Sequence, residues 1–342
     1  MPCSCKALGA FQKNMSEIIT FGSAVVDIFL KPEKASFDWG EKVQTGGWQM
    51  ETGGGGASAA VSFALQGFKT AYCGKVGGDV FGKTIANNLK NKDVGLDLLV
   101  KDEKQKTALS FVLSSGDTAK QVNDRIIFLA EGACHFLAEN EIKWHELKKA
   151  NLFYIAPLYE KSADLLEPLI MFAREHHEDR DSSENKIKIA LNPSVYQIKN
   201  KIHQLRHLIA KTDILILNLD EAAMLTDLPA GEEGLIIDKI QNMGVDTIAI
   251  TKGEEGALVA QGKHIYKVDI FPTKVAERTG AGDAFGSGFV AGLLEKNNIE
   301  YAIRLAMANS ASCLGQIGAQ NGLLKRGEVN NFPNLTIRQY EN

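Results

Sequence analysis

Long apolar runs, an excess of basic residues and paired cysteines are all missing from this sequence of 342 residues. No run approaches the roughly 20 apolar residues that span a bilayer, which excludes a membrane-spanning protein. The chain has 38 Lys and Arg against 42 Asp and Glu, a formal net charge of −4. Nucleic-acid-binding proteins present a basic face to phosphates, so this balance argues against nucleic acid as a partner.

The five cysteines do not fit a disulfide or zinc framework. Cys3 and Cys5 have no second pair at the spacing of a zinc site, and an odd number scattered along a chain cannot all be paired. The N-terminus has no apolar segment long enough for a secretory signal. We therefore expect reduced thiols in a cytoplasmic protein, with Cys73 and Cys313 packed in the interior.

Short apolar runs alternate with helical patterns along most of the chain. Strand-like runs lie at 18–21, 70–76, 151–155, 187–191, 214–217 and 247–250, and helix-like segments lie at 57–65, 81–89 and after each of the last four runs. This alternation predicts βαβ units, and hence an α/β fold with a doubly wound, mostly parallel sheet and helices on both faces. We expect the domain to cover residues 17–330, between an N-terminal extension (1–16), ordered or disordered, and a C-terminal tail (331–342).

Two stretches, at about 29–52 and 107–130, have strand-like patterns without intervening helices. We expect them to pair as a small antiparallel β-sheet that projects from the main body. Such a sheet would be a lid over a site, a structural flap or a dimer surface, and the sequence leaves these alternatives open.

The strongest functional signal is the segment Thr279-Gly-Ala-Gly-Asp283, which leads into a helix of small and apolar residues. The glycines leave the first backbone N–H groups of the helix open to an anion, and the helix dipole adds to the attraction. Asp283 would repel a bound phosphate, and its presence beside an anion site makes sense if its carboxylate takes a proton from a hydroxyl that then attacks the phosphorus. The alternative is a tight turn with a capping aspartate.

Two further motifs follow strand-like runs. Asn218 and Glu221 fall on one face of a first helical turn, where an amide and a carboxylate can hold hydrated Mg²⁺ beside phosphates. An asparagine N-cap with a first-turn glutamate explains the same pattern without a ligand. Thr251, with Gly253 and Gly256, would cradle a nucleotide phosphate or ribose, or would form a hairpin turn.

A run of four glycines, Gly53–Gly56, stands at the start of a helix. It does not match the dinucleotide-binding fingerprint, because Ala57 or Ser58 occupies the third glycine position and the first strand lies far upstream. A nicotinamide-dependent oxidoreductase is therefore disfavoured.

In their order along the chain, these motifs resemble the ribokinase family of carbohydrate kinases, also called the PfkB family, over about residues 17–325. The resemblance rests on the following segments: Gly53–Ala60, Gly77–Gly82, Leu191-Asn192-Pro193, Asn218 with Glu221, Thr251 with Gly253 and Gly256, Thr279–Asp283, Ile303–Ala308 and Gly318-Ala319.

The resemblance implies a doubly wound sheet with a small β-lid, and ATP-dependent phosphorylation of an alcohol on a sugar or nucleoside. Carried over by position, Asp283 would be the general base, and the backbone of Gly280, Ala281 and Gly282 would form an anion hole for the transferred phosphoryl group. The other implied positions are Glu221 for Mg²⁺ through water; Asn192, Asn218, Thr251, Gly253, Gly256 and Met307 for ATP; and Asp27, expected at the end of the first strand, Gly54 and Ser58 for the acceptor.

Four positions depart from the family pattern. Glu277 and Arg278 stand where the family usually has Asp-Thr, and that Asp often helps to bind a monovalent cation, so K⁺ activation is left open. Arg278 either adds positive charge near the phosphates or faces solvent. Ser58 replaces a common acceptor-binding Asn, and Glu131 replaces an Arg of several sugar-acid and hexose kinases, which disfavours an anionic acceptor.

We therefore expect a kinase that acts on a small neutral sugar. A nucleoside kinase of the same fold is the alternative, with Phe37, Trp39 or Trp48 of the lid stacking on a base. A non-catalytic nucleotide-binding protein would have lost Asp283 or the glycines beside it, and both are present. A homodimer formed through the lid is implied by the resemblance alone.

Overall fold

The computed structural model describes residues 17–34, 36–114, 125–175 and 187–341. The expected N-terminal extension (1–16) and the middle of the second lid stretch (115–124) lie outside the described residues. Within the described ranges, no helix is both long enough and apolar enough to cross a membrane.

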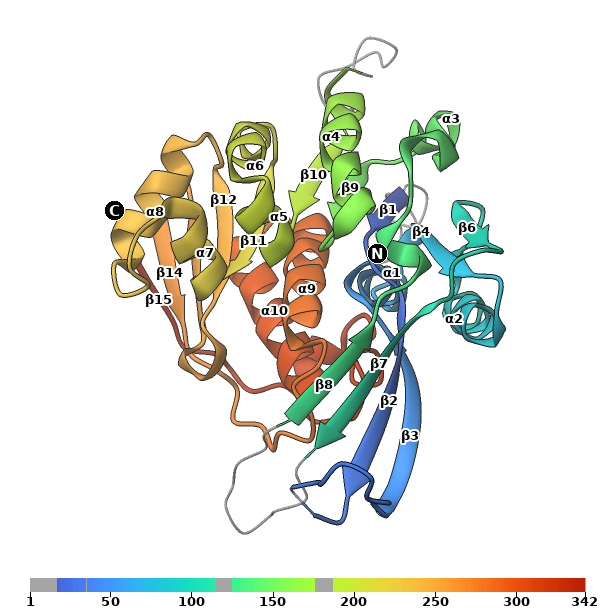
Figure 1. Ribbon diagram of the computed structural model, residues 1–342. Coiled ribbons are helices and arrows are strands. Elements are labelled where there is room, and N and C mark those ends of the chain that lie inside the picture. The colour runs from blue at the N-terminus through green and yellow to red at the C-terminus, as the bar shows by residue number, and fades with distance from the viewer. Residues whose placement is uncertain (1–16, 35, 115–124, 176–186, 342) are drawn as a thin grey trace, which may run out of the picture.

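An eleven-stranded sheet runs through the molecule (Figure 1). Its strands, in spatial order, are β15 (Ile337–Glu341), β14 (His264–Val268), β13 (Ala257–Gln261), β12 (Thr247–Thr251), β11 (Ile214–Asn218), β10 (Lys188–Leu191), β9 (Leu152–Ile155), β1 (Glu17–Phe21), β4 (Lys69–Gly77) and β5 (Val94–Gly95), with β6 (Leu99–Asp102) also paired to β4. Neighbours from β12 to β5 and β6 are parallel, and β13, β14 and β15 are added antiparallel. The predicted mostly parallel sheet is confirmed.

Helices cover both faces of this sheet. They are α1 (Gly55–Leu65), α2 (Val80–Asn91), α3 (Trp144–Leu147), α4 (Leu166–Glu175), α5 (Val195–Asn200), α6 (Ile202–Ile209), α7 (Leu219–Thr226), α8 (Glu233–Asn242), α9 (Ala281–Lys296) and α10 (Ile299–Leu314). Short 3₁₀ turns are η1 (Ala133–His135), η2 (Glu139–Glu141), η3 (Glu160–Leu165), η4 (Gly253–Glu255) and η5 (Glu328–Asn331). Along β11, Leu215 and Leu217 pack with α4–α8, whereas Ile214 and Ile216 pack with α1, α9 and α10. Burial on both faces explains why the central strands read as continuous apolar runs.

A second sheet of four strands projects from the body (Figure 1). Its order is β3 (Thr45–Gly53), β2 (Val25–Pro32), β7 (Ala108–Ser114) and β8 (Arg125–Ala130), and we call it the lid. The expectation of a purely antiparallel sheet was wrong, because β2 and β7 are parallel. The chain leaves the lid through α1 and returns only after β6, and such a long crossover allows parallel pairing.

Three other expectations need correction. Residues 331–342 are not only a tail, because residues 337–341 form β15, which pairs with β14 at the sheet edge. The strand at 247–250 is followed by the antiparallel strand β13 instead of a helix. Asp27 lies within β2 of the lid and not at the end of the first strand. The predicted burial of Cys73 and Cys313 is confirmed.

Candidate active site

The order of the central sheet reverses between β1 and β9, since the chain runs from β1 to β4 on one side and β9 to β12 lie on the other. The carboxyl ends of strands at such a switch point form the crevice in which α/β proteins bind ligands. Asn192 follows β10, and Asn218 and Thr251 end β11 and β12 as register partners. These three residues line one cavity together with Glu221 and Asp283.

The first turn of α9 lines the same cavity with Gly280 and Gly282. Gly280 is the N-cap residue, with φ +83°, and has no side chain that could cap the helix. The first N–H groups of a helix have no acceptor within the helix and carry the positive end of its dipole. A Cβ on Gly280 would lie 2.5 Å from the Cβ of Ala319, so close packing also requires glycine here.

The glycine-rich start of α1 is built differently. The Gly55 N–H donates to Ser23 Oγ (3.1 Å), and the N–H groups of Gly56 and Ala57 donate to the Ser23 carbonyl oxygen. Gly54 has φ +92°, and a Cβ there would lie 2.6 Å from that same oxygen. Ser23 therefore caps α1, and these donors are already used. Sequence reasoning missed Ser23, because no local motif marks a residue that caps a helix far along the chain.

The pKa of Asp283 is raised by the surroundings of its carboxyl group in this cavity. Burial and, to a smaller extent, the negative charge of Asp27 together raise its pKa to about 6. No described residue hydrogen-bonds its carboxylate, and Gly55 packs against it so closely that a Cβ would lie 3.1 Å from Oδ1. A carboxylate with a raised pKa accepts a proton more readily than an ordinary one.

Asn218 and Glu221 form a reciprocal cap at the start of α7. Asn218 Oδ1 accepts the Glu221 N–H (2.8 Å), and Glu221 Oε2 accepts the Asn218 N–H (2.9 Å). Burial raises the pKa of Glu221, hydrogen bonding to Asn218 lowers it, and the charges of Asp283 and Asp220 raise it again. The capping role left open by the sequence is thus present, and both residues also line the cavity.

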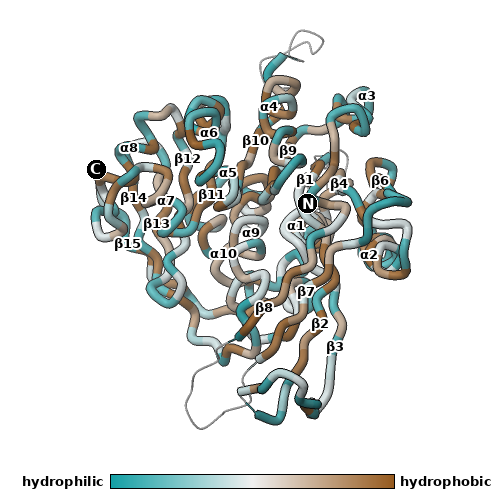
Figure 2. Tube along the Cα trace, in the orientation of Figure 1, coloured by the Kyte–Doolittle hydropathy of each residue, from teal (hydrophilic) through white to brown (hydrophobic). Residues whose placement is uncertain are grey.

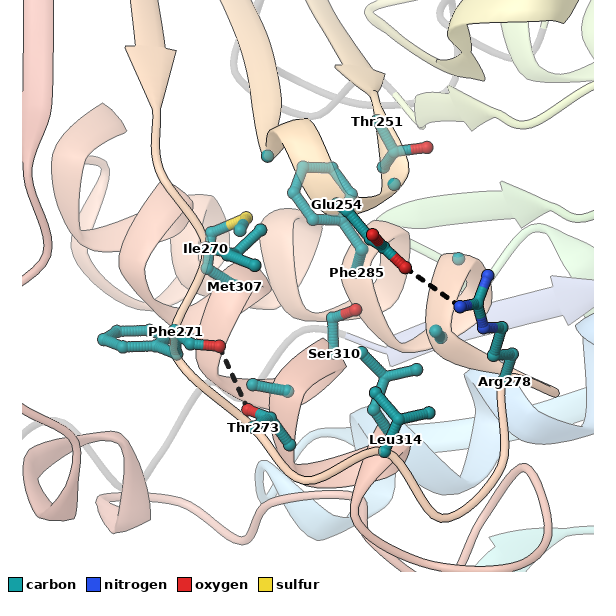
Figure 3. A pocket seen from close by; sticks show the side chains of 16 residues that line it. Thr251, Glu254, Ile270, Phe271, Thr273, Arg278, Phe285, Met307, Ser310 and Leu314 are labelled. Atoms are coloured by element: carbon teal, nitrogen blue, oxygen red, sulfur yellow. Dashed lines mark hydrogen bonds and ion pairs between the residues drawn. The ribbon is translucent and has the colours of Figure 1, made fainter. Parts of the chain in front are cut away.

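A second, wider cavity adjoins the first, and Thr251 and Gly282 line both (Figure 3). Of the predicted residues, Gly253, Gly256, Ala281 and Met307 also line it. Sequence reasoning missed several other lining residues: Ile270, Phe271, Thr273, Val275, Phe285, Ser310, Ala311 and Leu314. Their mostly apolar character does not separate a pocket wall from a core.

The turn between β12 and β13 has the hairpin geometry that the sequence left as an alternative. Gly256 has φ +89°, and a Cβ there would collide with the Val268 carbonyl oxygen. At the mouth of the wide cavity, Arg278 pairs with Glu254 (2.9 Å), and both side chains are exposed (Figure 3). The turn therefore shapes the cavity while needing no ligand for its own conformation.

On the lid, Asp27 is buried and accepts a hydrogen bond from Ser110 Oγ of the neighbouring strand β7. Burial raises the pKa of Asp27, the hydrogen bond from Ser110 lowers it, and the charges of Glu277 and Glu51 raise it. Because Asp27 also raises the pKa of Asp283, the lid carboxylate and the α9 carboxylate interact across the space between them.

Ser58 and Gly54 are in the lining of neither cavity. Ser58 is 2% exposed and accepts a hydrogen bond from Gln320 Nε2 (3.4 Å). Gln320 Oε1 in turn accepts hydrogen bonds from Asn88 and Thr52. The Ser58 hydroxyl therefore belongs to a buried polar network that joins α1, α2 and the lid.

Glu277 lies just before the glycine loop, and its two carboxylate oxygens accept hydrogen bonds from Arg125 (2.8 Å) and from the Thr279 N–H (2.7 Å). Residues 15–326 match the model of the pfkB family carbohydrate kinases. The chain belongs to this family.

Curated relatives of this carbohydrate kinase agree. The chain is 27% identical over 310 residues to the ribokinase of Haemophilus influenzae, covering 90% of this chain and 93% of that protein. It is 28% identical over 322 residues to the ribokinase of Bacillus subtilis, covering 92% and 98%. Together with the family match, these similarities identify the protein as an ATP-dependent sugar kinase, that is, a phosphotransferase with an alcohol acceptor.

Solved structures show that this kinase has the ribokinase fold. The ribokinase of Arabidopsis thaliana complexed with ribose and ATP matches with a TM-score of 0.74 at 21% identity, covering 93% of this chain and 98% of that one. A nucleoside kinase of Methanocaldococcus jannaschii matches with a TM-score of 0.73 at 20% identity, covering 93% and 97%.

Proposed function

We propose that the kinase transfers the γ-phosphoryl group of Mg-ATP to a hydroxyl of a small neutral sugar, with Asp283 as general base. The observation that carries the proposal is the position of this carboxylate, in the uncapped first turn of α9, where two cavities meet. The wide apolar cavity is suited to the adenosine, and the polar one to the phosphates.

In the proposed reaction, the acceptor oxygen bonds to the γ-phosphorus while the bond from that phosphorus to the bridging oxygen breaks. ADP leaves with the electron pair, and Asp283 takes the hydroxyl proton. The N–H groups of Gly280, Ala281 and Gly282 face the developing negative charge as an anion hole. Asn192, Asn218, Thr251, Gly253, Gly256 and Met307 are assigned to ATP, and Asp27, Gly54 and Ser58 to the acceptor side.

Mg²⁺ fits this site through Glu221. No group of three His, Cys, Asp or Glu side chains at metal-binding positions occurs in the described parts of the chain. Mg²⁺ commonly uses one or two carboxylates together with water and substrate phosphates. Both Glu221 and Asp283 line the cavity, and the charge of Asp283 raises the pKa of Glu221, so a bound cation would offset this repulsion.

A K⁺ site at Glu277 fits less well. A K⁺ ion there would share the carboxylate with the Arg125 guanidinium, and like charges repel. We therefore do not propose that Glu277 binds a monovalent cation.

The charges recorded around Asp27 support a neutral acceptor, because they are the carboxylates of Glu277 and Glu51. The alternative of a nucleoside acceptor stacked on lid aromatics receives less support. Side chains alternate along a strand, so Trp48 lies on the face of β3 opposite to Glu51, the register partner of Asp27.

We also propose a homodimer formed through the lid face opposite Asp27. Register places two rows of four apolar residues there: Met50, Ile28, Phe111 and Phe128, then Trp48, Leu30, Leu113 and Ile126. Trp48 and Phe128 are 70% and 58% exposed, and β2, β7 and β8 are markedly hydrophobic (Figure 2). A second copy of the chain presents the same apolar face and would cover it. Sedimentation of the wild type and of a Phe128→Asp variant tests this proposal: the wild type should sediment as a dimer and the variant as a monomer. A monomeric wild type would contradict the proposal.

The test of the proposed function is ADP release with Mg-ATP across pentoses, hexoses, sugar acids, sugar phosphates and nucleosides, with and without K⁺. We expect one neutral sugar to stand far above the other acceptors. A nucleoside in that position would favour the alternative kinase, and ATP binding without turnover on any acceptor would favour a non-catalytic role.

A further inference from the structure

Glu277 joins two parts of the molecule that are distant in the sequence. It stands two residues before Thr279 and is only 7% exposed. Its Oε1 accepts a hydrogen bond from Arg125 Nη1 (2.8 Å), and its Oε2 accepts one from the Thr279 N–H (2.7 Å). Arg125 is the first residue of β8, so one carboxylate connects the lid to the loop that leads into α9.

A buried carboxylate needs compensating partners, because loss of water disfavours its charge. Burial acts to raise the pKa of Glu277, but hydrogen bonds from Thr279 and the charge of Arg125 together hold it below its ordinary value. Glu277 therefore stays ionised in a place where its charge also acts on Asp27. The lid supplies the positive charge of this pair.

The hydrogen bond to Thr279 fixes the backbone immediately before Gly280. Gly280 itself has φ +83° and packs against Ala319, so the loop has little freedom on that side. A displacement at Thr279 would pass directly to the N–H groups at the start of α9. Errors of about 1 Å in such positioning cost large factors in rate.

We propose that Arg125 is a positioning residue for phosphoryl transfer. By pairing with Glu277 when the lid lies over the acceptor side, it fixes Thr279 and thereby aims the N–H groups that begin α9. The anion hole is then complete only when the lid is in place. The Arg125 guanidinium neutralises Glu277 in place of a monovalent cation. The inference rests on the proposed anion-hole role of residues 280–282.

The experiment compares Arg125→Met, Arg125→Lys and Glu277→Gln with Arg338→Met as a matched control. Arg338 is an exposed arginine paired with Asp269 at the far edge of the sheet, and it lines neither cavity. Arg125→Met should lower kcat by about tenfold or more while the KM for ATP changes by less than about threefold. Arg125→Lys should recover part of the loss, and the control should match the wild type.

Two further readouts separate positioning from general damage. The Arg125→Met/Glu277→Gln double variant should lose no more than the worse single variant, because both act through one contact. Hydrogen exchange should speed up in the peptide that contains the Thr279 amide. If Arg125→Met does not fold, Arg125→Lys and Glu277→Gln carry the same comparison.

Unchanged kcat in a folded Arg125→Met variant, or losses that multiply in the double variant, would overturn the inference. So would K⁺ activation of the wild type that disappears in Glu277→Gln, since a cation would then neutralise Glu277. These failures differ from a failure of the proposed function, in which Asp283→Asn retains full turnover.

Discussion

Replacing Asp283 with Asn should greatly slow phosphoryl transfer and stabilise the protein at neutral pH. Burial, together with the charge of Asp27, raises the pKa of Asp283 from an ordinary 3.8 to about 6. Each pKa unit corresponds to about 1.4 kcal/mol, so ionisation of this carboxyl at neutral pH costs the folded state at most about 3 kcal/mol. An amide of the same shape removes that cost, although it cannot accept the acceptor proton.

The sign of the pH dependence makes this prediction specific. Because the folded-state pKa is raised, the cost is present above about pH 6 and fades as the pH falls below it. The variant should therefore have a higher Tm than the wild type at about pH 7.5, and this gain should fall to about half at about pH 5, because the cost disappears fully only when the pH approaches the ordinary value of 3.8. Thermal unfolding followed by circular dichroism at both pH values measures the difference.

ADP release and calorimetric ATP binding complete the test. Turnover should fall by about 10²–10⁴-fold, as expected for loss of a general base, while ATP still binds. Asp97→Asn, which changes an exposed carboxyl that lines neither cavity, is the matched control and should change neither Tm nor turnover. A folded Asp283→Asn variant with full turnover, or one less stable than the wild type at both pH values, would refute the reasoning.

Three other outcomes are expected. The kcat/KM of the wild type should fall about tenfold between pH 7 and pH 5 as Asp283 is protonated. Asp27→Asn should move this acidic fall in kcat/KM to lower pH, because it removes a negative charge near Asp283. The same pH profile in both proteins would contradict an interaction between Asp27 and Asp283. Gly55→Ala should raise the KM for the acceptor more than that for ATP, because its Cβ would stand 3.1 Å from Asp283 Oδ1. Gly54→Ala should in addition lower the Tm, because its Cβ would lie 2.6 Å from the Ser23 carbonyl oxygen; an unchanged acceptor KM in folded Gly55→Ala would contradict the placement of the acceptor beside Asp283. Glu221→Gln should raise the Mg²⁺ concentration needed for half-maximal rate, and an unchanged Mg²⁺ titration would remove Glu221 from the proposed metal site.

Much of the fold could be predicted, because the central strands are buried on both faces and therefore read as apolar runs. The strand at 337–341 could not, since four of its five residues are exposed and its partner β14 lies far upstream. The parallel pairing of β2 with β7 was missed for a related reason. Pairing direction depends on the path of the chain between two strands, and residue type does not encode that path.

The candidate site shows the same difference between residues that a short sequence pattern marks and residues that depend on a distant contact. Residues in the glycine motif and at the ends of β11 and β12 were found from short patterns, and the structure brings them to two adjoining cavities. Ser23, Gln320 and Arg125 were not found, because each acts through a contact with a distant segment. Such residues carry no local signal, whatever their importance.

The two glycine-rich helix starts show why a motif alone does not define an anion site. Both sequences remove side chains from a helix N-terminus, and both contain a residue of positive φ, Gly54 in one and Gly280 in the other. At α1 the donors are taken by Ser23, so a phosphate would have to displace an existing cap. At α9 no side chain caps the helix, and a carboxylate of raised pKa stands in its first turn. The difference lies in which backbone donors are already satisfied, and this is why the proposed phosphoryl site belongs to α9.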